Sequence, residues 1–205
     1  KLKNNLFYQN VAVVTGGNAA AKIIGILTAP VITRLYSPED YGIFSVLLSI
    51  AGIAGSLATL RYAVTIPLAR DIRVADNLLK LCFLITFSLS LIFVILILVF
   101  GGYITERFSI EKITPFLWVL PIVLLGQGFY DALSNWALRE KKFRLITKTK
   151  LTQGISSSFV KIGLGAVSVK PLGLMIGHIV QEFAGIGSFL VQLHKTNTDF
   201  FKSFS

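Results

Sequence analysis

The sequence predicts an all-α integral membrane protein built as a six-helix transmembrane bundle, and three observations support this fold class. Hydrophobic residues make up 54% of the 205 residues and charged residues only 15%, whereas a soluble domain carries about 25% charged residues. The hydrophobic residues fall into segments long enough to cross a hydrocarbon layer about 30 Å thick. Lysines and arginines concentrate in alternate connections between these segments, as the positive-inside rule describes.

Six apolar segments are bounded by charged residues, glycine or proline. They predict spans near residues 11–33, 41–69, 78–101, 115–138, 151–169 and 172–193. The third segment is apolar on all sides and is expected to face lipid. The others carry polar stripes, so they are expected to enclose a polar interior.

The second segment has the clearest helix start in the chain. Ser37 provides an N-cap, Pro38 suits the first helical position, and Glu39 and Asp40 lie at the positive end of the helix dipole. We therefore expect one continuous helix from here to residue 69, carrying Arg61 within it.

The distribution of lysine and arginine predicts the orientation. With the N-terminus inside, inner segments carry thirteen of these residues and outer segments four. The inner residues are Lys1, Lys3, Arg70, Arg73, Lys80, Arg139, Lys141, Lys142, Arg144, Lys148, Lys150, Lys195 and Lys202, and the outer ones are Arg34, Arg107, Lys112 and Lys170. Residues 1–205 thus form one transmembrane lobe with both termini cytoplasmic, and residues 139–150 form a basic cytoplasmic loop. This loop favours topology determination and contact with anionic lipid, or docking of a cytoplasmic partner.

Net charge and cysteine content exclude other classes. The formal net charge is +10, but the cations lie in short loops between apolar runs and not on one solvated face, so nucleic acid is not an expected partner. The single cysteine, Cys82, excludes a disulfide within the chain and a cysteine metal site.

The remaining three cations, Lys22, Arg61 and Lys161, fall inside predicted spans. A charge near the bilayer centre costs about 2.5–3.5 kcal/mol on insertion scales, which makes these residues candidates for binding an anion. Asn18 shares a helix face with Lys22, whereas the face that carries Arg61 is the least polar. Arg61 therefore either enters a cavity or snorkels to the interface.

The fourth and sixth spans add polar residues to the predicted interior. These residues are Gln127, Asp131, His178 and Glu182. The two carboxylates either neutralise Lys22 or Lys161 or take part in proton or sodium coupling. A lone histidine in such a cavity is more often a hydrogen-bonding residue than a proton relay.

The interior therefore suits an anionic, heavily hydroxylated ligand, because lysine and arginine match phosphate oxygens and small polar groups match sugar hydroxyls. The sequence contains no phosphate-binding loop, no metal-ligand spacing and no nucleophile–base signature. We therefore expect a transporter or channel and not an enzyme, without a cofactor or metal.

Four blocks of the sequence carry a resemblance to a known family. They are RLYSPEDYGIFSVLLSIAGI, ATLRYAVTIPLARD, NWALREKKFRLITKTKLTQG and GLMIGHIVQEFAG. In this order they resemble bacterial polysaccharide, or O-antigen, flippases of the multidrug/oligosaccharidyl-lipid/polysaccharide exporter superfamily, which includes the MATE transporters. Pro67 and Leu68 depart from the family, whose members tend to carry these two residues in the opposite order. The resemblance spans the whole chain but reaches only the first of the family's two six-helix lobes.

The resemblance implies a function and its site. Such proteins flip undecaprenyl-diphosphate-linked oligosaccharide across the bacterial cytoplasmic (inner) membrane by alternating access, in the biosynthesis of polysaccharides such as the O-antigen of lipopolysaccharide. Their cavity cations map onto Lys22, Arg61 and Lys161. The expected partners are the lipid-linked oligosaccharide, membrane lipids, and a glycan polymerase or chain-length machinery. The alternatives are an ion-coupled small-molecule or multidrug exporter of the same superfamily and a non-transporting scaffold for glycan-synthesis enzymes.

Overall fold

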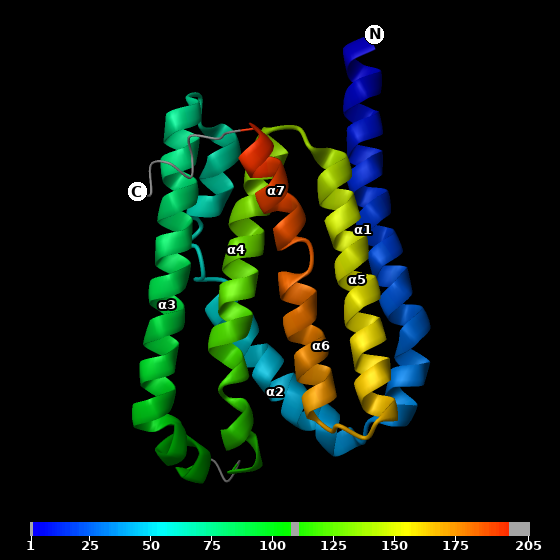
Figure 1. Ribbon diagram of the computed structural model, residues 1–205, viewed down its shortest axis with the longest axis vertical. Coiled ribbons are helices and arrows are strands. Elements are labelled where there is room, and N and C mark those ends of the chain that lie inside the picture. The colour runs from blue at the N-terminus through cyan, green and yellow to red at the C-terminus, as the bar shows by residue number, and fades with distance from the viewer. Residues whose placement is uncertain (1, 108–110, 197–205) are drawn as a thin grey trace.

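A computed structural model describes residues 2–107 and 111–196, and the side chains within them except those of residues 2–12, 104–106 and 111. Every regular element in these ranges is a helix (Figure 1). The elements are α1 (Leu2–Leu35), α2 (Pro38–Gly55), the 3₁₀ helix η1 (Tyr62–Leu68), α3 (Ile72–Arg107), the 3₁₀ helix η2 (Glu111–Phe116), α4 (Val119–Arg139), α5 (Phe143–Ala166), α6 (Leu172–Phe183) and α7 (Ile186–Thr196). The expected cytoplasmic C-terminus, with Lys202, lies outside the described residues.

The helices run alternately between the two ends of one bundle. In Figure 1, α1, α3 and α5 run away from the end at which α1 begins, while α2 with η1, α4, and α6 with α7 return to it. Helix α1 packs on α5, α5 on α6, and α3 on α4, which also contacts α6 and η1. Helix α4 is therefore central to the bundle.

Four helical segments are long and apolar enough to cross a membrane. They are Val13–Leu35, Ile72–Tyr103, Lys112–Arg139 and Leu172–Thr196. The prediction of an all-helical, multi-pass membrane chain is thus confirmed. Helix α2 with η1, and helix α5, are not among these four segments. That they also cross the membrane, as a six-helix bundle requires, stays a prediction.

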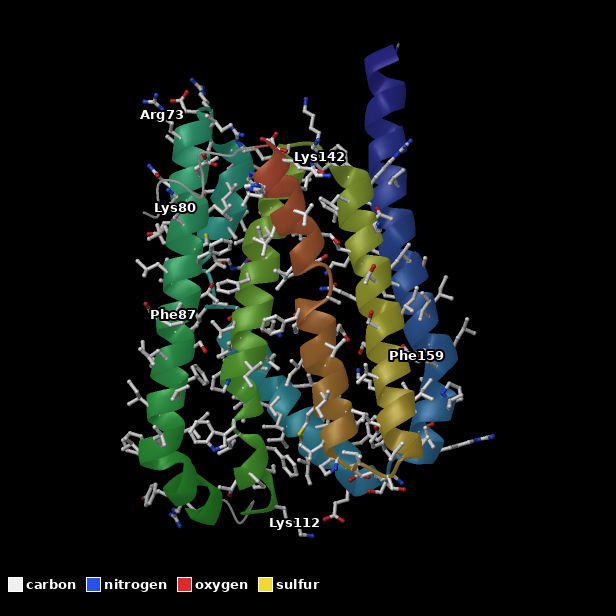
Figure 2. The ribbon with its side chains drawn as sticks, viewed as in Figure 1. Arg73, Lys80, Phe87, Lys112, Lys142 and Phe159 are labelled. Atoms are coloured by element: carbon white, nitrogen blue, oxygen red, sulfur yellow. The ribbon has the colours of Figure 1, made fainter. Side chains whose placement is uncertain are left out.

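The outer surface also fits a membrane. Figure 2 shows Arg73, Lys80 and Lys142 at the end where α3 begins and Lys112 at the opposite end. Between the two ends, Phe87 on α3 is 58% exposed and Phe159 on α5 is 79% exposed. Exposed phenylalanines at mid-height are typical of a lipid-facing surface.

The predicted helix start at residue 37 is confirmed. The Ser37 hydroxyl accepts from the Asp40 backbone N–H at 3.2 Å, and the Asp40 carboxylate accepts from the Ser37 backbone N–H at 2.8 Å. Both bonds of a capping box are present, so local sequence alone determines where α2 begins.

Replacing Ser37 with alanine is expected to lower the stability of α2 by about 0.5–2 kcal/mol, because an amide of the first turn loses its acceptor. Hydrogen exchange should show faster exchange of the Asp40 amide. Ser45→Ala is the control, because the Ser45 hydroxyl is exposed and bonds only the Gly42 carbonyl of its own helix. Equal exchange in the two variants would contradict the assigned cap.

The prediction of one continuous helix through residue 69 is wrong. Helix α2 ends at Gly55, and η1 begins at Tyr62 after a turn in which Leu60 and Arg61 have φ of 45° and 64°. The Thr86 hydroxyl, from α3, shares its proton between the Ala58 carbonyl at 2.9 Å and the Cys82 carbonyl of its own helix at 2.8 Å. The turn forms because such a contact replaces a bond of the interrupted helix.

The last predicted span is also interrupted. Helix α6 ends at Phe183 and α7 begins at Ile186, with Gly185 between them at φ 95°. A Cβ at Gly185 would lie 2.6 Å from Cβ of Thr149 on α5. Glycine satisfies both the backbone angle and the close approach, so the break depends on packing against α5.

The predicted basic loop at residues 139–150 is wrong over most of its length. Helix α4 ends at Arg139 and α5 already begins at Phe143. Only three residues, from Glu140 to Lys142, connect them. The additional turns of α5 carry Lys150 along the bundle instead of leaving it in a loop.

Two hydrophobic cores hold the ends of the bundle. One centres on Leu133 and Trp136 of α4 and Phe189 of α7, and the other on Leu120 of α4, Tyr36 and Leu174 of α6. The polar residue Gln127 lies on α4 between these cores, and Asp131 follows about one turn later, next to Tyr130 of the first core. The candidate site is built around this part of α4.

Candidate functional site

Asp131 stands on α4 beside the interrupted second pass. Its Oδ2 accepts from the hydroxyl of Thr59 at 3.2 Å, and its Oδ1 accepts from Nδ2 of Asn135 at 3.1 Å. Thr59 belongs to the turn between α2 and η1. Arg61 and Lys150 lie within electrostatic range of the carboxylate, so Asp131 joins the turn to the polar interior.

Glu182 lies at the end of α6, next to the break between α6 and α7. Its Oε1 lies 3.8 Å from Nε2 of His178, one helical turn earlier, and Gln127 of α4 lies within reach of the carboxylate. Gly126 allows α4 and α6 to approach, because a Cβ there would lie 2.7 Å from Cβ of Glu182. Nε2 of His178 is buried without a hydrogen-bond partner in the described part of the chain.

Lys161 reaches the same region from α5. Its side chain is half-buried, with Nζ 5.5 Å from the centroid of the Phe44 ring and within electrostatic range of Glu182. Gly177 of α6 leaves room for the lysine stem, which a Cβ at that position would meet. Lys161 therefore lies between α2, α5 and α6.

Lys150 is the functional candidate that the sequence analysis missed. Its Nζ lies 4.3 Å from the centroid of the Tyr130 ring, within electrostatic range of both Asp131 and Glu182. The prediction of a loop at residues 139–150 concealed it. A signal existed, because Lys150, Gln153, Ser157 and Lys161 recur at helical steps of three and four residues and so share one face.

An open hollow of about 420 Å³ lies beside this charged interior. It is lined from α1 by Asn18, Ala21 and Lys22, from α5 by Lys150, Gln153 and Gly154, and from α6 by Gln181. Lys22 is exposed, whereas Gln153 is 6% exposed. The lining contains two ammonium groups and three amides, and none of the described lining residues is acidic.

The predicted site residues fall into two groups and one outlier. Asn18 and Lys22 line the hollow, while Gln127, Lys161 and His178 lie around Glu182 in the charged interior. Asp131 is exposed and is linked to this group through Lys150. Arg61 is exposed at the turn between α2 and η1, and no described face of the hollow includes it. Its expected place on a continuous helix is wrong, because α2 ends at Gly55 and Arg61 lies in the turn that follows. The binding roles of all these residues stay predictions.

The side chains of the hollow suit an oxygen-rich ligand. Ammonium and amide N–H groups in a hollow match the oxygens of phosphate and sugar. In the described residues, no three histidine, cysteine, aspartate or glutamate side chains come together in a way that could hold a metal ion. Lys150 links the two groups of residues, because it lines the hollow and also faces the acids of the interior.

A family model described as "Polysaccharide biosynthesis protein" matches residues 31–201. No curated protein and no solved structure matches the chain. The matched residues include α2 to α7, and therefore most of the charged interior and the α5 and α6 walls of the hollow.

Proposed function

Because the chain belongs to the polysaccharide biosynthesis protein family, we propose that it moves a lipid-linked oligosaccharide across a membrane during polysaccharide biosynthesis. The substrate class is an oligosaccharide on undecaprenyl diphosphate, and the membrane is the bacterial cytoplasmic membrane. The chain supplies one lobe of a two-lobe transporter.

The observation that supports this proposal is the cation-lined hollow. Lys22 and the surrounding amides lie in an opening of about 420 Å³, while the outer surface of the helices carries exposed apolar side chains. Diphosphate oxygens would accept from Lys22 and the amides, the sugars would occupy the hydrated hollow, and the polyprenyl chain would remain in lipid. Rocking of two lobes would then alternate access.

The interior carboxylates favour a second candidate function, an ion-coupled exporter of small molecules. Asp131 and Glu182 lie on neighbouring helices at the level of the helix breaks, where transporters often bind coupling ions. Lys150 and Lys161 lie close enough to offset both charges. This compensation favours the anionic lipid substrate over a cationic drug.

Replacing Lys22 with glutamine tests the proposal. In cells that depend on this protein, we expect surface polysaccharide to fall at least about tenfold at matched expression, which is the effect of losing one charged hydrogen bond. Lys22→Arg should retain most of the output. Lys148→Gln is the matched control, because Lys148 is exposed on α5 and does not line the hollow.

Adding Arg61→Gln sharpens this test. Because Arg61 lies outside the hollow, its replacement alone should reduce output less than Lys22→Gln does. Full polysaccharide output from the Lys22→Gln, Arg61→Gln double variant would contradict the proposed function. Lost recovery of glycan-synthesis enzymes after neutralising Lys141, Lys142 and Arg144, together with full output from that double variant, would instead support the scaffold alternative.

A further inference from the structure

We propose that Lys150 is a ligand-binding cation of the hollow and acts together with Lys22 on one anionic group. This inference rests on the proposed function. It adds a binding residue, Lys150, that the proposed function does not require.

Lys150 and Lys22 approach the hollow from two packed helices. Lys22 stands on α1 and Lys150 on α5, which pack along much of their length in Figure 1. Gln153 lies next to Lys150 on the same wall, and Gln181 adds an amide from α6. The hollow therefore presents ammonium groups from α1 and α5 and amide donors from α1, α5 and α6.

The ammonium group of Lys150 has donors to offer. Within the described side chains it forms no hydrogen bond and no ion pair within 4.0 Å, and its contact is with the face of the Tyr130 ring. A ring face attracts a cation without accepting a directional N–H bond as an oxygen does. The three N–H donors of a half-buried ammonium are thus left for groups that enter the hollow.

A chain of contacts fixes the Tyr130 ring. The Thr149 hydroxyl donates to the Ile146 carbonyl at 2.9 Å, so it accepts from the Tyr130 hydroxyl, whose oxygen lies 3.0 Å away. Gly185, at the break between α6 and α7, leaves room for Thr149. The break between α6 and α7 therefore contributes to the placement of Lys150. The position of this side chain is thus fixed by the packing of several helices.

The carboxylates of the interior attract Lys150 but do not occupy its N–H donors. Asp131 already accepts from Thr59 and Asn135, and Glu182 lies beside His178 and Gln127. Both carboxylates attract Lys150 at longer range. Such a lysine can donate to an anion without first breaking a close ion pair.

Two cations suit an anionic group with more than one charge. A diphosphate offers oxygens to both Lys22 and Lys150, whereas a single phosphate is smaller and is expected to gain less from the second lysine. We therefore assign Lys150 a role in selecting the diphosphate.

The test measures binding of inorganic pyrophosphate to the purified full chain by isothermal titration calorimetry. We expect Lys150→Gln to weaken pyrophosphate binding about tenfold, to change phosphate binding less, and to lower the dependence of binding on salt. Lys150→Arg should restore most of the affinity. Lys148→Gln, a charge loss two residues away on the same helix, should leave binding unchanged.

Further measurements separate the possible outcomes. Circular dichroism verifies that Lys150→Gln remains folded, and Tyr130→Leu, which removes the ring face, should weaken binding in the same direction. Nanodiscs with and without undecaprenyl diphosphate distinguish a lipid headgroup from a free anion, because the lipid should compete with pyrophosphate. If Lys22→Gln weakens pyrophosphate binding and Lys150→Gln does not, the proposed role of Lys150 is overturned and the proposed function stands. An absence of binding to the wild-type chain, with normal polysaccharide output from Lys22→Gln, would overturn both proposals.

Discussion

Replacing Tyr36 with alanine is expected to lower the free energy of unfolding by about 3–5 kcal/mol, the range for removing a large buried aromatic side chain. Tyr36 is 3% exposed and lies between α1 and α2. Its ring fills the space left by Gly165 of α5 and Gly173 of α6, where an added Cβ would meet it. Its hydroxyl donates to the Lys161 carbonyl at 2.7 Å.

Tyr36→Phe separates the contribution of the hydroxyl from that of the ring, and Tyr62→Ala serves as the control. Tyr36→Phe keeps the ring and loses one hydrogen bond, so it should cost about 1 kcal/mol. Tyr62→Ala removes a tyrosine that is 43% exposed, and should change stability less than Tyr36→Ala. Burial raises the pKa of the Tyr36 phenol, so its hydroxyl keeps the donated proton into alkaline solution. Thermal unfolding in one detergent measures all three variants, and equal losses in Tyr36→Ala and Tyr62→Ala would contradict the assigned packing.

Replacing Gly154 with leucine is expected to separate α1 from α5 and to cost about 1–3 kcal/mol, the range for overpacking a close contact. A Cβ at Gly154 would lie 3.2 Å from the Ala21 carbonyl oxygen, which belongs to the backbone and cannot rotate away. Gly154 and Ala21 also line the hollow. The substitution should therefore reduce pyrophosphate binding as well as stability.

Gly163→Leu is the matched control, because it makes the same chemical change on the same helix. A Cβ at Gly163 would meet no atom within 4 Å. Both variants gain the same helix propensity, so the difference in their unfolding temperatures isolates the contact with α1. If Gly154→Leu unfolds at the same temperature as Gly163→Leu, α1 does not pack on α5 as described.

Properties that depend on neighbouring residues could be predicted from the sequence. The start of α2 follows from Ser37 and Asp40, which lie within one helical turn of each other. The polar interior was predicted in part. Lys161 and Gln127 lie close to Glu182, because charged residues in apolar spans turn away from lipid, whereas Asp131 is exposed.

The helix breaks could not be predicted in the same way. The sequence from residue 41 to residue 69 is apolar enough for one helix, yet contacts from Thr86 and Asp131 stabilise a turn within it. This turn moved Arg61 from the predicted helix face to an exposed position outside the hollow. Hydropathy reports which segments prefer lipid and does not report which backbone groups find partners on another helix.

The sequence by itself determined that this is a helical membrane protein with an internal set of charges, because hydropathy, capping and charge are properties of adjacent residues. Only the tertiary structure decided which of the cations line the same hollow. Lys150 appeared to belong to a loop, but the contact of Thr149 with Gly185 and Tyr130 places it beside the hollow. Tyr130 lies on α4, Thr149 on α5 and Gly185 between α6 and α7, and packing brings them together.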